Sequence, residues 1–108
     1  MSQDTMDLYV APGSGLAARA LGGEMVIMVA ESARLLTLNE VAAVLFQSAD
    51  GRTPLRIIVA ERVCREFEVD FDQAYADAVT CVNGLAAAGV LRVAGEPLPP
   101  LPSPGEDA

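Results

Sequence analysis

Polar and apolar positions alternate along the first third of the chain with the two-residue period of β-strands. The clearest run covers residues 24–29, a second covers 33–37, and a weaker alanine-rich run covers 16–21. Gly22-Gly23 separates the weak run from the clearest one, and such a pair is typical of a two-residue hairpin turn. The pattern therefore predicts a three-stranded antiparallel meander.

The apolar spacing then changes to the three-to-four period of amphipathic helices. The first predicted helix begins at a capping box formed by Thr37 and Glu40 and stops before Gly51. The second runs over about 54–66 and the third over about 71–88. Three strands followed by three helices predict an α+β, winged-helix-like domain.

The composition changes at both ends of this domain. Residues 1–15 mix aspartate, proline and glycine, which predicts a flexible N-terminal arm. Residues 94–108 are rich in proline, which predicts a disordered tail. The folded domain is therefore expected to cover residues 16–93 and to end in a short extended strand over 90–93.

The chain is strongly acidic, since 7 arginines oppose 15 carboxylates and the net charge is −8. Phosphate backbones and anionic lipids repel such a chain. The predicted third helix, which a winged helix would place in the groove of DNA, carries Asp70, Asp72 and Asp77 and no basic residue. We therefore expect neither a nucleic-acid partner nor a membrane partner.

The cellular compartment follows from the lack of export signals. The apolar runs are shorter than the ~20 residues of a membrane helix, and the first fifteen residues carry no positive charge. These features favour the cytoplasm, where Cys64 and Cys81 are expected to be reduced, buried side chains.

Residues with catalytic potential are few. The sequence has no histidine, no glycine-rich phosphate loop and no nucleophile paired with a base, and two cysteines without histidine make a poor zinc site. Asp70 and Asp72 fit the cap and first turn of the third helix better than they fit a catalytic pair. We therefore expect no enzymatic activity, no cofactor and no metal ion.

Two features predict a binding surface. The last strand of the meander runs into a helix, which leaves an edge whose backbone groups a peptide can pair with. The third helix has an apolar band wider than one wall of a small core requires. Part of this band is a stripe of mostly small residues, which is either a consequence of good helix formers or the floor of a groove. The stripe consists of Ala74, Ala78, Cys81, Leu85 and Ala88.

Several short motifs follow one another in order: Gly23-Glu24, Val26-Ile27, Leu36 to Ala43, Asp50 to Thr53, Phe67 to Asp70, Asp77, Leu85 and Gly89 to Leu91. In this order and spacing they resemble the PqqD-like family, the pyrroloquinoline-quinone biosynthesis protein D homologues, also called RiPP recognition elements. The resemblance extends over residues 16–93. The stretch between Thr53 and Phe67 is a residue or two longer than the family pattern.

The resemblance implies a peptide-binding chaperone. Such proteins hold the leader of a ribosomally made precursor peptide and present it to a modifying enzyme, often a radical S-adenosylmethionine enzyme. The leader is expected to add as a strand to the last strand of the meander, with its apolar side chains against the third helix. The residues implied in this site are Arg34, Leu35, Leu36, Thr37, Ala74, Asp77, Ala78, Cys81 and Leu85.

An alternative from another class stays open at this point. The same exposed strand would also suit a non-catalytic structural module that joins two copies as a homodimer.

Overall fold

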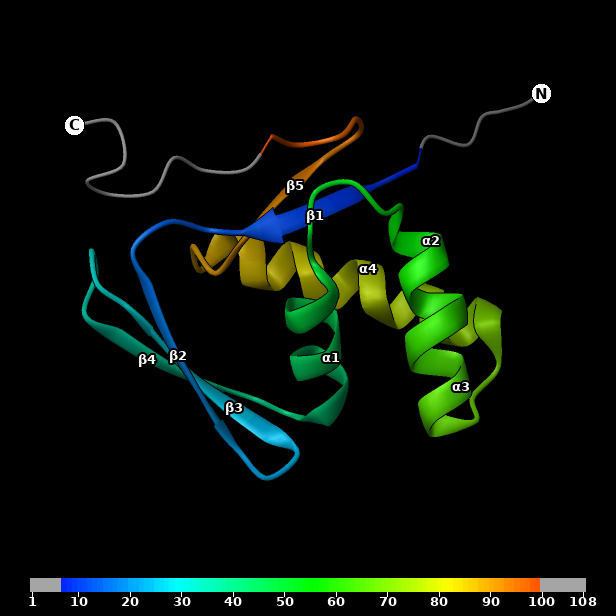
Figure 1. Cartoon of the computed structure of the whole chain (residues 1–108), viewed down its shortest axis with the longest axis horizontal. Coiled ribbons are helices and arrows are strands. Elements are labelled where there is room, and N and C mark those ends of the chain that lie inside the picture. Colours follow the sequence, from blue (N-terminus) through cyan, green and yellow to red (C-terminus); the bar gives the residue numbers. More distant parts are fainter. Residues whose placement is uncertain (1–6, 100–108) are drawn as a thin grey trace.

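The computed structural model describes residues 7–99 and has an α+β architecture (Figure 1). The strands are β1 (Tyr9–Pro12), β2 (Leu16–Leu21), β3 (Glu24–Val29), β4 (Arg34–Leu38) and β5 (Leu91–Ala94). The helical elements are α1 (Glu40–Ser48), α2 (Leu55–Ile58), the π-helical turn η1 (Val59–Val63), α3 (Cys64–Phe67) and α4 (Phe71–Ala87). Strands β2, β3 and β4 form one antiparallel sheet in that order, and helices follow it. The predicted meander and fold class are therefore confirmed.

The central strand β3 gives the meander an inner and an outer face. Its residues Met25, Ile27 and Val29 are buried, because their side chains point toward the helices. The turn between β2 and β3 is the predicted glycine pair, and Gly22 has a φ of +65° that suits glycine. The inner face of the sheet therefore forms one wall of the core.

Helix α1 begins two residues later than a Thr37 cap would imply. Asn39 is the N-cap, because its side-chain oxygen accepts a hydrogen bond from the Ala42 N–H at 2.9 Å. Thr37 instead belongs to β4, where it pairs with Val26. The capping-box prediction is therefore wrong, although the expected helix is present. The reason is that the strand continues to Leu38 before the chain turns.

The second predicted helix is a continuous helical segment over residues 55–67 that contains the π turn η1. A π turn accommodates more residues than an α turn. The buried Val59 and Val63 bound this turn, so both remain in the core. The segment ends at Glu68, whose left-handed backbone has a φ of +53°.

The expected N-terminal arm differs from the structure in its second half. Strand β1 pairs with β5 in a two-stranded antiparallel sheet, and Val10 is fully buried between the elements around it. The Gly13 N–H also donates to the Val90 carbonyl at 2.9 Å. Residues 9–12 are therefore part of the fold, because they pair with a strand that lies about eighty residues further along the chain. Residues 1–6 of the predicted arm lie outside the described part.

The first residues of the predicted tail are also attached to the domain. Ala94 ends β5, the Leu98 N–H donates to the Gly51 carbonyl at 2.8 Å, and Arg92 donates to the Pro99 carbonyl at 3.3 Å. The rest of that prediction concerns residues 100–108, which the structure does not describe.

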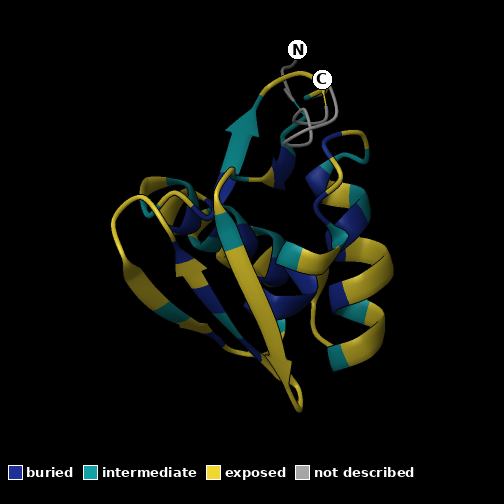
Figure 2. Ribbon diagram, turned by 60° about the vertical axis from the view of Figure 1, so that its left-hand side comes forward, coloured by how far each residue is buried: buried dark blue, intermediate teal, exposed yellow. Residues whose placement is uncertain are grey.

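The core lies between the inner face of the meander and the helices, as the distribution of buried residues in Figure 2 shows. Its largest fully buried side chains are Ile27, Leu45, Leu55, Val10, Val59, Val82 and Val90. They come from both sheets and from helical elements, so this one core holds the described domain together. Within residues 7–99, no helix has the length and apolarity needed to span a membrane.

Candidate functional site

Strand β4 is an edge of the meander, and the direction of its backbone N–H and C=O groups determines whether another strand can pair with it. Leu21 and Glu24 pair across the two-residue turn, so they exchange both backbone hydrogen bonds. Successive residues of β3 therefore direct their backbone hydrogen bonds alternately to β2 and to β4. Ile27 is directed to β4, so its partner Leu36 is hydrogen-bonded to β3. The N–H and C=O groups of Leu35 and Thr37 therefore point away from the sheet.

The described chain leaves this edge of β4 without a partner strand (Figure 1). At the end of the described chain, the Leu98 N–H donates to the Gly51 carbonyl. Arg34, Leu35 and Thr37 are exposed, and Leu35 retains 65% of its accessible surface. Leu36 is half-buried and packs against the core. The strand thus combines free backbone groups with an apolar side chain at the rim of the core.

The C-terminal end of helix α4 lies near the end of β3, the strand with which β4 pairs. The helix begins as predicted at Asp70, whose carboxylate accepts the Gln73 N–H at 3.2 Å. It ends before Gly89, which has a φ of +86° and lies so close to Val29 that a Cβ would be 3.7 Å from Val29 Cγ1. The end of α4 therefore lies next to the last residue of β3, and that residue pairs with Arg34, the first residue of β4.

The small residues of α4 do not form an accessible floor in this structure. Ala74, Ala78 and Leu85 retain only 7%, 2% and 9% of their accessible surface and belong to the core. Their small side chains let α4 pack closely against α1 and η1, which it contacts. The wide apolar band of the helix is therefore explained by packing on several neighbours, and this part of the expected groove has to be corrected.

Asp77 and Cys81 remain beside the buried stripe, on a flank of α4 that faces away from Tyr75. Asp77 is exposed and accepts a hydrogen bond from Gln73 Nε2 at 3.1 Å. Cys81 is half-buried, and burial raises the pKa of its thiol. The thiol therefore stays protonated near neutral pH and contributes an apolar contact rather than a nucleophile.

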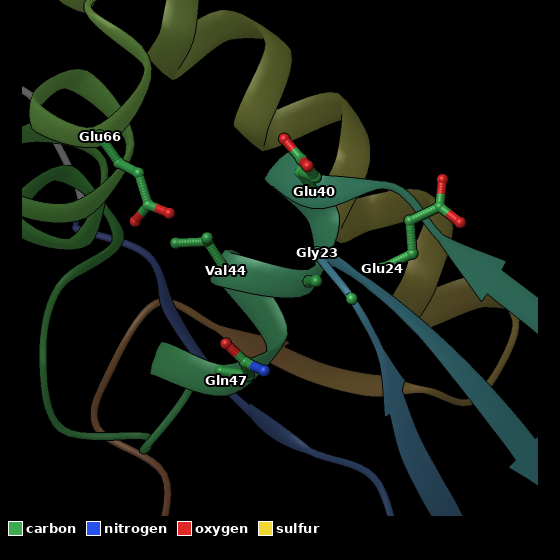
Figure 3. Close-up of a pocket in the computed structure, with 8 residues that line it drawn as sticks. Gly23, Glu24, Glu40, Val44, Gln47 and Glu66 are labelled. Carbon is green, nitrogen blue, oxygen red and sulfur yellow. The ribbon is translucent and has the colours of Figure 1, made fainter.

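A polar pocket that the sequence did not suggest lies at the hairpin end of the meander. Its volume is about 260 Å³, and it lies between the Gly22-Gly23 turn, α1 and α3. Figure 3 shows Glu24, Glu40 and Glu66 around it. Among residues 7–99 no group of three or more acidic, histidine or cysteine side chains has the arrangement of a metal site. The pocket is therefore an acidic hollow of the surface.

The β4 edge offers backbone groups and apolar side chains for non-covalent contacts. Residues 7–99 contain no buried polar or charged side chain. At this edge, Leu35 and Thr37 each present one backbone N–H donor and one C=O acceptor next to apolar side chains. This arrangement fits an extended polypeptide that adds as a further strand.

Comparison with known proteins gives a family and a fold. The model of the family described as coenzyme PQQ synthesis protein D (PqqD) matches residues 24–91, which is more than half of the chain. The fold is similar to that of a solved structure described as "TbiB1 in Complex with the TbiA(beta) Leader Peptide". That similarity has a TM-score of 0.68 and 17% sequence identity, and covers 76% of this chain and 94% of the other. No curated protein sequence matches the chain.

Proposed function

Because this chain belongs to the PqqD family, we propose that it binds the leader of a ribosomally made precursor peptide and presents it to a modifying enzyme. The observation that carries the proposal is the edge of β4, which no strand within residues 7–99 pairs with and where Leu35 and Thr37 direct their backbone groups outward. TbiB1, which shares the fold, is described in complex with a leader peptide, and this supports the same class of ligand.

In this proposal the leader adds as a strand along β4. Leu35 and Thr37 together contribute two donors and two acceptors, and each net hydrogen bond is worth about 1 kcal/mol. About 4 kcal/mol corresponds to a dissociation constant of only about 1 mM. Backbone pairing alone is therefore too weak for a selective chaperone, so side-chain contacts must supply the rest.

Those contacts come from β4 and from the accessible flank of α4. Leu36 and Cys81 are half-buried at the rim of the core, where they suit an apolar side chain of the leader. Arg34 and Asp77 are exposed and carry opposite charges, so each would favour a leader residue of the other sign. Ala74, Ala78 and Leu85, which the sequence placed in the site, support it from within the core by holding α4.

The modifying enzyme that receives the leader is, in this proposal, of the radical S-adenosylmethionine type. The chain itself acts by binding and catalyses no reaction. We place the encounter in the cytoplasm, a compartment in which the free thiols Cys64 and Cys81 would stay reduced.

The binding mode predicts the effect of a proline at Leu35. Proline removes the outward N–H of this residue, and the β3–β4 ladder does not use that group. Leu35→Pro should therefore weaken binding of the leader encoded beside the gene of this chain about fivefold, the cost of one lost backbone hydrogen bond of about 1 kcal/mol. Isothermal titration of the full chain measures this change, with Leu35→Ala separating the side chain from the N–H.

Strand β2 offers the matched control. By the same alternation, Ala18 directs its N–H away from the opposite edge of the sheet. Ala18→Pro should leave leader affinity unchanged and should melt like Leu35→Pro. Equal losses in both variants would contradict strand addition at β4. Sedimentation at several concentrations tests the alternative of a structural module. A homodimer that forms with or without the leader would favour a dimerisation module over a leader-binding chaperone.

A further inference from the structure

The outer face of the meander is uncovered within the described chain, and it is mostly apolar between Glu24 at the turn and Thr37 on β4. Leu21 on β2, Met28 on β3 and Leu35 on β4 retain 54%, 42% and 65% of their accessible surface. A hollow of about 500 Å³ lies over this face, and we call its lining residues the outer patch. Figure 2 shows exposed residues along the strands of the meander. The outer patch consists of Ala17, Ala18, Arg19, Leu21, Val26, Met28 and Leu35.

The outer patch differs from an ordinary solvent-facing sheet surface. Antiparallel sheets with one buried face usually carry polar residues on the other. Here Arg19 is the one charged residue that lines the hollow, and the remaining lining residues are apolar. Exposed apolar residues that are contiguous on a rigid element mark an interaction surface. In the sequence, this surface is indicated by the strand 24–29, which has apolar residues on both faces.

The charge of the patch argues against a second copy as its occupant. A two-fold interface repeats the same residues on both sides, so each copy would bring an Arg19 and no carboxylate from the lining. It would also bring together two chains that each carry a net charge of −8. A complementary surface would be apolar, would bear a carboxylate opposite Arg19, and would belong to a different protein with less negative charge.

The patch is continuous with the edge of β4. The side chain of Leu35 lies in the patch, while its backbone N–H and C=O point out of the sheet edge. A strand added to β4 would place every second side chain on this same face, because side chains alternate along a strand. A bound leader would therefore widen the patch by one strand.

The size of the face explains why such widening matters. Six residues extend about 20 Å and three strands about 15 Å across, and a stable interface buries about 800 Å² on each partner. The face alone is smaller than that. Resting on the proposed function, we infer that the modifying enzyme docks on the outer patch, on a composite surface of Arg19, Leu21, Met28, Leu35 and alternate side chains of the bound leader.

Charge reversal at Arg19 tests this inference. The probe is the modifying enzyme encoded beside the gene of this chain, titrated with the full chain with and without saturating leader. Leader-loaded wild type should bind the enzyme more tightly than free wild type. Arg19→Glu and Met28→Gln should each weaken enzyme binding at least tenfold, and both should keep leader affinity within twofold.

Arg52→Glu is the matched control, because it makes the same charge change on the exposed turn at Asp50. Equal enzyme affinity of Arg19→Glu and Arg52→Glu would overturn the inference, while normal leader binding would leave the proposed function in place. Wild type that binds enzyme but no leader would refute the proposed function and the composite surface together. A wild-type dimer in sedimentation that Met28→Gln dissociates would assign the patch to a second copy and would also overturn the inference.

Discussion

At the scale of single residues, Asp50 organises the turn that joins α1 to the second helical segment. Its carboxylate accepts the N–H of Arg52 at 2.9 Å and that of Thr53 at 2.8 Å, and the Thr53 hydroxyl donates to it at 2.9 Å. These bonds, the one from Arg52 first, hold the pKa of Asp50 below its ordinary value of 3.8. The next residue, Gly51, has a φ of +75° and donates its N–H to the Val10 carbonyl at 2.7 Å.

Removal of this carboxylate should lower stability in a pH-dependent way. The folded pKa of Asp50 lies below the unfolded one, so the ionised group stabilises the fold above the unfolded value of 3.8. That contribution is lost as pH falls through the folded pKa. Asp50→Ala should reduce the free energy of unfolding by about 1 kcal/mol near pH 7, a small value because water screens the exposed group.

Urea denaturation at several pH values checks this expectation. The difference between wild type and Asp50→Ala should shrink as the pH falls below about 4. Glu31→Ala, at an exposed turn, serves as the comparison. A difference that grows toward acid pH would show that the carboxylate destabilises the turn when ionised.

At the scale of elements, the π turn η1 explains how the second helical segment accepts its length. The resemblance predicts one or two additional residues between Thr53 and Phe67, and the structure has a π turn in this stretch. The turn takes up the additional length locally, so Val59 and Val63 both stay buried. An ordinary α-helix of the same length would rotate one of its ends away from the core.

This interpretation predicts unequal effects of two single-residue deletions. Ala60 is exposed within η1, so its deletion should convert the π turn toward an α turn and cost at most about 1–2 kcal/mol. Ala76 is exposed within the regular helix α4. Its deletion rotates the following residues by about 100° and should cost about 4 kcal/mol or more, because Val82 and Leu85 leave the core.

Thermal unfolding followed by circular dichroism separates the two deletions. A chain without Ala60 should melt cooperatively near wild type, whereas one without Ala76 should show no cooperative transition. Comparable losses would mean that η1 is required by its packing and not by the length of the segment.

At the scale of the whole molecule, the N-terminal and C-terminal segments of the described chain are joined by strand pairing and by hydrogen bonds to a shared residue. Strand β1 pairs with β5, and Gly51 bonds both to Val10 and to Leu98. The meander packs on this assembly through its inner face, while no described element covers its outer face or the edge of β4. The proposed docking face therefore lies opposite the core on the same sheet, and the proposed leader site lies at the β4 edge, at the rim of that core.

This arrangement predicts that Val10 matters for stability although it lies near the N-terminus. Val10 is fully buried, so Val10→Ala should cost about 2 kcal/mol of unfolding free energy. Val69→Ala makes the same substitution at a residue that retains 45% of its surface and should change stability by less than about 0.5 kcal/mol. Chemical denaturation measures both, and equal effects would mean that β1 is not part of the cooperative unit.

Local signals in the sequence determined the meander, the fold class and the cap of α4. Alternating side chains over 24–29, a glycine pair at a two-residue turn and Asp70 three residues before Gln73 act within a few residues of one another. Their energies depend little on the rest of the chain, so the sequence alone predicts them. The motifs from Leu36 to Asp50-Gly51 likewise indicated the family that the chain belongs to.

The tertiary structure alone decided what depends on distant partners. Residues 9–12 become a strand because β5 lies beside them, and Ala74, Ala78 and Leu85 are buried because α1 and η1 cover that side of α4. The outer patch stays exposed because no described element packs on it. Strand pairing and helix facing are set by residues far away in the sequence, and local periodicity carries no information about which neighbour will cover which face.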